Sequence, residues 1–191
     1  MGDGSARMPR PPAPKPARPA PRPSPPPQGR ARWPEARHYA ALDLGTNNCR
    51  LLIARPQGSG FTVVDAFSRI VRLGEGLASS GRLSDAAIER TIAALKICAD
   101  KLKRRHVALS RSVATEACRQ ASNGPEFIRR VYRETGIVLD IITAEEEARL
   151  AVLGCHALLE PGDGPALVFD IGGGSTELVL VDSTDTQPRI L

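Results

Sequence analysis

The sequence predicts an α/β fold, in which a mixed β-sheet is flanked by helices and preceded by a disordered tail. After residue 38, short apolar runs bounded by turn signals alternate with stretches of helical periodicity, a pattern typical of layered α/β domains. The first part of the chain is different, because twelve of the 17 prolines lie between Pro9 and Pro34. We therefore divide the chain into a tail, residues 1–37, and one folded domain, residues 38–191.

The positive charge of the chain is concentrated in the tail. Residues 1–37 carry a net charge of +6 and residues 38–191 a net charge of −1, within a total of +5. The basic character therefore does not indicate a nucleic-acid-binding domain. The tail is rich in proline and poor in apolar residues, which predicts disorder with some polyproline II character. We expect a solvated extension with at most a weak attraction to polyanions.

The composition also limits the cellular compartments in which the protein is expected. No apolar run is long enough for a secretory signal or a transmembrane helix. The four cysteines include no C-x-x-C pair, which argues against zinc and favours reduced, mostly buried thiols. The sequence thus predicts a cytoplasmic protein that has neither a membrane nor a specific nucleic-acid partner.

The folded part begins with three strands in a meander and continues with alternating helices and strands. Ser84 is a good N-cap for the first long helix, and Gly136 is suited to end a later one. In that later helix, an inner face of Phe127, Ile128, Val131 and Tyr132 is expected. The expected strands are 39–44, 49–54, 61–73, 107–113, 137–142, 166–171 (a buried strand) and 176–181, and the expected helices are 84–105, 115–121, 123–136 and 144–159.

Two segments share one design, in which an aspartate near a strand end is followed by a glycine-containing turn and a second strand. They are LDLGTN, with Asp43, Gly45, Thr46 and Asn47, and FDIGGGST, with Asp170, Gly172, Gly173, Gly174 and Ser175. Glycine lets the backbone approach a ligand, and consecutive N–H groups can bind phosphate. An aspartate beside such a turn is better suited to Mg²⁺. One such turn is usually a structural hairpin, but two of them favour a metal–phosphate clamp. Neither is a P-loop or a dinucleotide-binding fingerprint, because each leads into a strand.

Two further segments have candidate chemistry and also a plain structural explanation. Glu145, Glu146 and Glu147 begin a predicted helix, where the helix dipole favours acids. Arg119 follows a strand end and could bind phosphate through two parallel hydrogen bonds, although a surface arginine is the simpler explanation. The residues alone leave both questions open.

Together these segments resemble the exopolyphosphatase / guanosine pentaphosphate phosphohydrolase (Ppx/GppA) family, within the actin, Hsp70 and sugar-kinase superfamily. The resemblance runs from about Tyr39 to Leu191 and excludes the tail. It rests on matched order and spacing of DLGTNNCRLLIA (43–54), LSDAAIERT (83–91), VATEACR (113–119), TAEEEARLAVLG (143–154) and VFDIGGGSTELVLVD (168–182). Thr46 and Asn48 stand where the family often has serine.

The resemblance implies a ribonuclease-H-like (actin-like ATPase) lobe with the site residues assigned by position. It implies that residues 43–47 and 172–175 form two phosphate loops, that Arg119 lies on the phosphate chain, and that Glu147 is the catalytic glutamate. Asp43 and Asp170 would bind Mg²⁺ or another divalent cation, and Glu177, which matches a further acidic position near the site, would be a third metal-binding residue. Glu145 and Glu146 would remain helix-start acids.

The expected activity is release of the terminal phosphate from polyphosphate or guanosine pentaphosphate by a water molecule that Glu147 activates. Family members have a second lobe of comparable size, so we expect a fragment with little activity of its own, and a homodimer for the longer protein. Two alternatives stay open, a lobe that binds polyphosphate or an alarmone without cleaving it, and an ATP-dependent kinase of the same superfamily.

Overall fold

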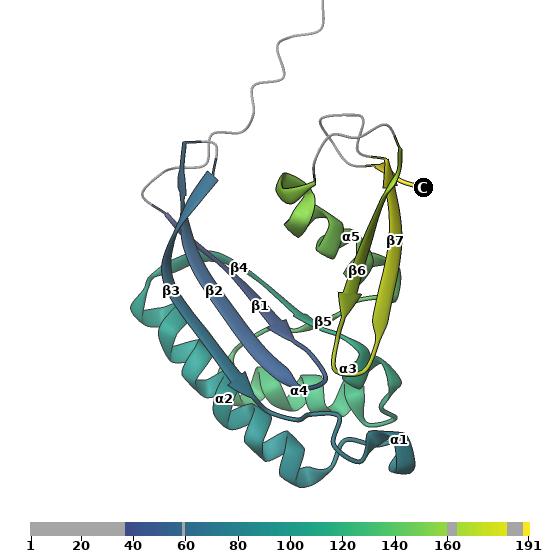
Figure 1. Cartoon of the computed structure of the whole chain (residues 1–191). Helices are drawn as coiled ribbons and strands as arrows, with labels where there is room; N and C mark the ends of the chain where they lie inside the picture. The colour runs from purple at the N-terminus through teal and green to yellow at the C-terminus, as the bar shows by residue number, and fades with distance from the viewer. Residues whose placement is uncertain (1–36, 59, 160–163, 183–188) are drawn as a thin grey trace, which may run out of the picture. The chain divides into compact units, whose positions relative to one another are not determined.

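A five-stranded mixed sheet forms the larger layer of the fold (Figure 1). The structure is a computed structural model that describes residues 37–58, 60–159, 164–182 and 189–191. The strands lie in the order β3-β2-β1-β4-β5, with β1 parallel to β4 and β4 parallel to β5. They are β1 (His38–Leu44), β2 (Asn48–Gln57), β3 (Gly60–Ile70), β4 (Val107–Ala114) and β5 (Asp140–Ile141). The predicted α/β class with a mixed sheet is confirmed, whereas the predicted tail falls, apart from Arg37, outside the described residues.

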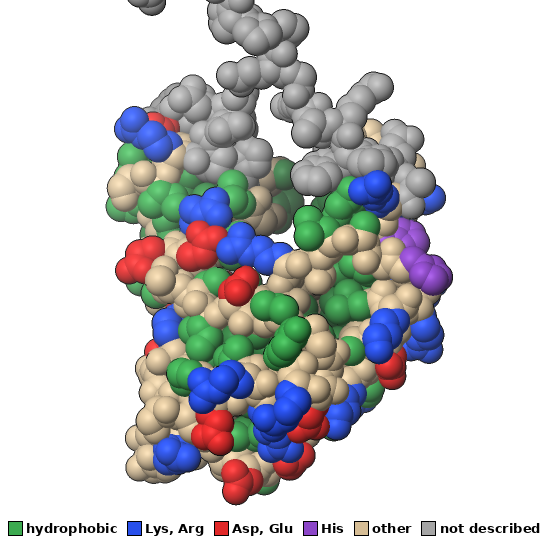
Figure 2. Space-filling model, turned by 180° about the vertical axis from the view of Figure 1, so that it is seen from behind, with side chains coloured by type: hydrophobic (Ala, Val, Ile, Leu, Met, Phe, Trp, Pro, Cys, Tyr) green, Lys and Arg blue, Asp and Glu red, His purple; other side chains and the backbone are tan. Residues whose placement is uncertain are grey.

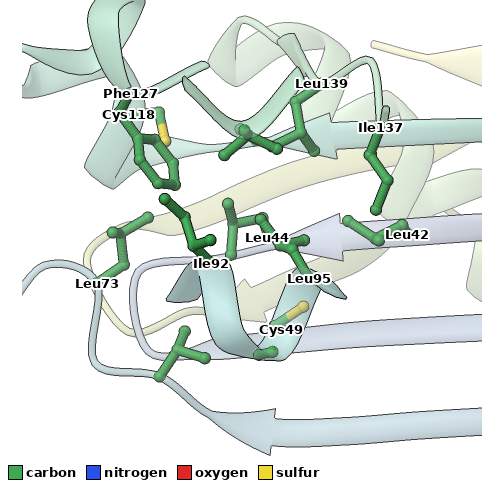
Figure 3. Packing of buried hydrophobic residues seen from close by; sticks show 14 of the residues in the cluster. Leu42, Leu44, Cys49, Leu73, Ile92, Leu95, Cys118, Phe127, Ile137 and Leu139 are labelled. Carbon is green, nitrogen blue, oxygen red and sulfur yellow. The ribbon is translucent and has the colours of Figure 1, made fainter. Parts of the chain in front are cut away.

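Helices α2 (Asp85–Arg104) and α4 (Gly124–Thr135) cover one face of this sheet (Figure 1). As predicted, Ser84 caps α2, with its hydroxyl accepting a hydrogen bond from the Ala87 N–H. The apolar stripe of α2, including Ile92 and Leu95, packs on Leu42 and Leu44 of β1 (Figure 3). Burial of this stripe is the main reason the helix lies on the sheet.

Helix α4 has three of its four predicted core residues facing inward. Phe127 and Val131 are buried and Ile128 is partly buried against the same core. The prediction for Tyr132 is wrong, because its side chain is 59% exposed. Gly136 ends the helix as predicted, in the left-handed conformation with φ 72°, which glycine adopts without strain.

The predicted strand at residues 137–142 is too long, because only Asp140–Ile141 pairs with a neighbour. The ladder joins Val113 to Asp140 and Ala114 to Ile141, and β4 ends at Ala114. Ile137 and Leu139 are buried all the same. Their apolar alternation reflects packing on the core and not strand pairing, which is why the sequence pattern overstates the strand.

A second, antiparallel sheet contains β6 (Ala166–Ile171), β7 (Thr176–Asp182) and β8 (Arg189–Ile190). Val179 and Val181 face α5 (Ala144–Cys155) and pack against Val152. The prediction that residues 166–171 form a buried strand is wrong, since no residue of β6 is buried: Ala166 and Val168 are only half-buried, and Phe169 is 62% exposed. Side chains alternate between the two faces of a strand, and among the described residues only one face of β6 is covered.

The remaining elements are short connections. They are α1 (Leu77–Ser80), α3 (Glu116–Gln120) and a 3₁₀ turn (His156–Leu158) that follows α5. All four cysteines are free thiols, and Cys49, Cys98 and Cys118 are buried. Among the described helices, none is long and apolar enough to cross a membrane. Acidic and basic side chains are interspersed on the face shown in Figure 2, in keeping with the near-neutral charge of the folded part.

Candidate functional site

The two glycine-containing turns are tight hairpin turns, as predicted. In the first, the Gly45 N–H donates to the Asn48 carbonyl at 2.9 Å, and in the second the Gly172 N–H donates to the Ser175 carbonyl at 2.9 Å. The hydrogen bonds fix each turn between two antiparallel strands, β1–β2 and β6–β7. Each aspartate therefore lies on its strand one residue before the final ladder pair.

The second turn packs directly against the first. A methyl group on Gly173 would lie 2.9 Å from Asn47 Cβ, and one on Gly174 would lie 2.6 Å from Thr46 Oγ1. Carbon atoms in contact ordinarily stand about 3.5–4.0 Å apart, so neither position has room for a side chain. The close approach of the two turns is the physical reason for the consecutive glycines.

A pocket of about 280 Å³ lies between the turns. Ten of the twelve predicted site residues line it, namely Asp43, Gly45, Thr46, Asn47, Glu147, Asp170, Gly172, Gly173, Gly174 and Ser175. Arg119 and Glu177 do not line it. Strands β1 and β6, helix α5 and the two turns thus place carboxylates and backbone amides around one small volume.

The carboxylates around the pocket influence one another. Burial raises the pKa of Asp43, and the negative charge of Asp170 raises it further, while Arg50 opposes the shift. Burial likewise raises the pKa of Glu147, and Glu177 and Asp43 add to that shift, while Arg119 opposes it. Both groups hold a proton more readily than usual because burial and anionic neighbours disfavour the ionised form.

A divalent cation fits this set of donors. Among the described residues, no three acidic, histidine or cysteine side chains converge closely enough to form a complete metal-binding cluster. Mg²⁺ is commonly held by only one or two carboxylates, with water and phosphate oxygens as the other ligands. Asp43 and Asp170 both line the pocket, and Glu177 is the cross-strand partner of Asp170. A bound cation would relieve the mutual repulsion of these carboxylates.

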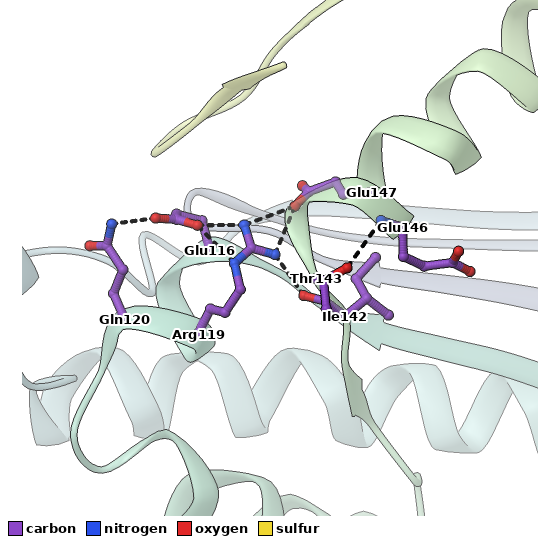
Figure 4. Close-up of polar contacts among 7 residues, drawn as sticks. All are labelled: Glu116, Arg119, Gln120, Ile142, Thr143, Glu146 and Glu147. Carbon is purple, nitrogen blue, oxygen red and sulfur yellow. Dashed lines mark hydrogen bonds and ion pairs between the residues drawn. The ribbon is translucent and has the colours of Figure 1, made fainter. Parts of the chain in front are cut away.

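Arg119 lies behind Glu147 and not on the pocket wall. Its guanidinium donates to Glu116, to the Ile142 carbonyl at 2.6 Å and to Glu147 Oε2 at 3.1 Å (Figure 4). Burial lowers the pKa of Arg119, but its hydrogen bonds to Glu116 and Glu147 outweigh that effect and raise it. The expected contact of Arg119 with phosphate stays a prediction.

Sequence reasoning missed Arg50 and Thr115, which also line the pocket. Arg50 is the register partner of Asp43 across the first hairpin. Counting back from the two-residue turn at Thr46 and Asn47 would have paired these positions, so a sequence signal existed. Thr115 follows β4, and only the parallel pairing of β4 with β1 brings it to the site.

A second, larger cavity of about 610 Å³ adjoins the first. It shares Asp43, Arg50, Thr115, Glu147 and Asp170 with the smaller pocket. The added lining comes mainly from apolar residues of the sheet strands and of α5, together with Arg111. The smaller pocket therefore opens into a wider, mainly apolar space.

Comparisons with known proteins identify the family of this chain. The model of the Ppx/GppA phosphatase family matches residues 52–190. The chain belongs to the Ppx/GppA phosphatase family. The crystal structure of the Aquifex aeolicus Ppx/GppA family member is 36% identical, with a TM-score of 0.69, and the match covers 81% of this chain and 51% of that one.

Two further structures of Ppx/GppA-related proteins also match this chain. An exopolyphosphatase-like protein is 36% identical with a TM-score of 0.73, covering 82% of this chain and 49% of that one. An exopolyphosphatase from Cytophaga hutchinsonii is 26% identical with a TM-score of 0.74, covering 81% and 50%. The predicted ribonuclease-H-like lobe is confirmed, and the chain spans about half the length of these Ppx/GppA relatives.

Proposed function

We propose that this Ppx/GppA chain supplies the phosphate loops and the general base of a phosphohydrolase that releases terminal phosphate from polyphosphate or guanosine pentaphosphate. The observation that carries the proposal is the single pocket in which two backbone turns meet the Glu147 carboxylate. Hydrolysis of a phosphoanhydride needs little covalent chemistry from the protein. It needs a held phosphate, neutralised charge and an oriented water molecule, and the pocket has groups for each.

The turns would hold the terminal phosphate. Backbone amides in a tight turn form a concave donor site for anions, and the hydroxyls of Thr46 and Ser175 and the amide of Asn47 add donors on the same pocket wall. Asp43 and Asp170 would hold Mg²⁺ or another divalent cation, which when bound supplies positive charge beside the phosphate. Glu177 would support this site from the neighbouring strand.

Glu147 would act on water. Its carboxylate lines the pocket, and a base with a raised pKa accepts a proton more readily. The water oxygen bonds to the terminal phosphorus while the bridging P–O bond breaks. Glu147 takes the proton of the water, and the leaving phosphate chain keeps the electron pair of the broken bond.

The two candidate substrates differ in the group attached to the far end of their phosphates. A polyphosphate continues with further anionic groups, whereas guanosine pentaphosphate ends in a nucleoside. The adjoining cavity, which is mainly apolar but carries Arg50 and Arg111, has room beside the phosphates for the rest of a substrate. Parallel assays of both compounds would identify the substrate.

The deciding experiment measures phosphate release by the protein that the full open reading frame of the gene encodes. Long-chain polyphosphate, guanosine pentaphosphate and ATP are compared with Mg²⁺ present, for the wild type and Glu147→Gln. We expect release from one of the first two, and a loss of about 10²–10⁴-fold in Glu147→Gln, the usual contribution of a general base. Glu145→Gln is the matched control, because Glu145 is exposed, lies two residues away and lines neither cavity.

The alternatives have different outcomes in the same assay. Turnover of ATP alone would indicate a kinase of the superfamily. Binding of polyphosphate or the nucleotide without release, unchanged by Glu147→Gln, would indicate a binding lobe. Either result would refute the proposed hydrolysis.

A further inference from the structure

The guanidinium of Arg119 has every one of its donors engaged by protein. A guanidinium has five N–H donors. Nε and Nη2 donate to Glu116 Oε2, Nη1 donates to the Ile142 carbonyl, and Nη1 and Nη2 both donate to Glu147 Oε2 (Figure 4). A side chain with all its donors satisfied is held in one orientation, and the partners of Arg119 lie on α3, just after β5 and on α5.

The partners of Arg119 form two groups, one away from the small pocket and one on its wall. Glu116, three residues earlier on α3, and the Ile142 carbonyl, just after β5, engage the guanidinium without any contribution to the small pocket. Glu147, on α5, meets the Nη1–Nη2 edge and lines the pocket itself. The side chains of all three charged residues are shielded, with only 22% of Arg119 and 18% of each glutamate exposed.

The contact with Glu147 uses only one of its two oxygens. Both bonds from Arg119 end on Oε2 at 3.1 Å. In the described part of the chain, no hydrogen bond reaches Glu147 Oε1. An arginine free to turn would prefer the parallel, two-oxygen arrangement of a fork facing a carboxylate. Glu116 occupies the Nε–Nη2 edge that such an arrangement would use most readily.

We propose that Glu116 is a positioning residue that acts through Arg119 on Glu147. Because Glu116 binds one edge of the guanidinium, Arg119 can donate hydrogen bonds only to Oε2 of Glu147. Oε1 of Glu147 then stays available to the attacking water. The proposal rests on the proposed function, since it gives Glu147 the role of base. It assigns Glu116 a task although Glu116 lines neither cavity.

Removal of Glu116 would free one edge of Arg119. The guanidinium could then turn and bind both oxygens of Glu147, which would compete with water for the base. In Glu116→Ala we expect kcat to fall about tenfold, the range for loss of one charge-assisted contact, with a smaller change in KM. Glu116→Gln keeps one acceptor oxygen and should recover part of the loss.

A double-variant cycle separates this role from general destabilisation. If Glu116 acts only through Arg119, Glu116→Ala costs nothing further in an Arg119→Ala background. Glu126→Ala is the matched control, because Glu126 is likewise an acid in the first turn of a helix, α4, and lines neither cavity. Full kcat in Glu116→Ala, independent losses in the double variant, or a loss confined to KM would overturn the proposal.

A measurement without turnover keeps the test independent of the enzyme assay. In ¹⁵N-labelled protein, the Arg119 Nε–H should exchange slowly with water and have the same chemical shift in the wild type and in Glu126→Ala, and its chemical shift should change in Glu116→Ala, where Nε loses its present partner. Rapid exchange already in the wild type would overturn the proposal. Absence of phosphate release from a wild type with slow Nε–H exchange would instead refute the proposed function and leave the Glu116–Arg119 contact standing.

Discussion

The close packing of the two phosphate turns predicts a large effect of one added methyl group, in Gly174→Ala. That methyl would lie 2.6 Å from Thr46 Oγ1, 3.1 Å from Cγ2 and 3.2 Å from Cβ of the same residue. Rotation of Thr46 is restricted, because Gly74 also lies close to Cγ2, so that a methyl on Gly74 would stand only 2.4 Å away. The turns must therefore separate by about 1 Å to reach ordinary carbon contact.

A displacement of this size has a predictable cost. Misplacement of a catalytic group by about 1 Å reduces turnover roughly 10²-fold, and overpacking costs about 1–3 kcal/mol of stability. Gly174 has no positive φ, so the crowding and not the backbone conformation of alanine is responsible. We expect Gly174→Ala to lower kcat/KM for phosphate release by about this factor and to lower Tm by several degrees.

Two variants make the result specific. Gly154→Ala adds the same methyl in α5, where no atom lies within 4 Å, and should stabilise the helix by roughly 0.5–1 kcal/mol with activity unchanged. Thr46→Ser removes Cγ2 and keeps a hydroxyl, so it should restore part of the activity of Gly174→Ala. Wild-type activity and Tm in Gly174→Ala would refute the contact between the turns and the reasoning built on it.

Two predictions concern stability. The side chain of the buried Asn123 accepts a hydrogen bond from the Leu83 N–H at 2.8 Å and donates one to the Leu83 carbonyl at 3.0 Å. Asn123→Ala should therefore lower the free energy of unfolding by about 1–3 kcal/mol in urea titrations. A change smaller than the error of the titration would contradict this. Hydrogen bonds from Lys101 and Arg105 lower the pKa of Asp65 to about 2, so the stabilisation from Asp65 is present above its ordinary pKa of 3.8 and is lost as the pH falls toward 2. Asp65→Asn should therefore be less stable than wild type at pH 7, with the difference shrinking in acid; an unchanged difference at pH 2.5 would count against the ion pairs.

Much of the fold is accessible from local sequence patterns. The apolar stripe of α2, the cap at Ser84 and the ending of α4 at Gly136 agree with prediction because each depends on neighbouring residues. The errors occur where packing overrides pattern. Tyr132 has the spacing of a core residue but its side chain is exposed, and β6 is an apolar strand that the described residues cover only in part.

The candidate site likewise has one part that local sequence predicts and another that only long-range packing decides. Local sequence is enough to specify the two hairpin turns, because turn type and strand register depend on the chemistry of a few neighbouring residues, and with them the positions of Asp43 and Asp170. Long-range packing is needed to bring Gly174 against Thr46 and to place Arg119 behind Glu147, held by Glu116. Segments far apart in the chain meet through sheet pairing and core packing, and no local pattern specifies which side chain will face which.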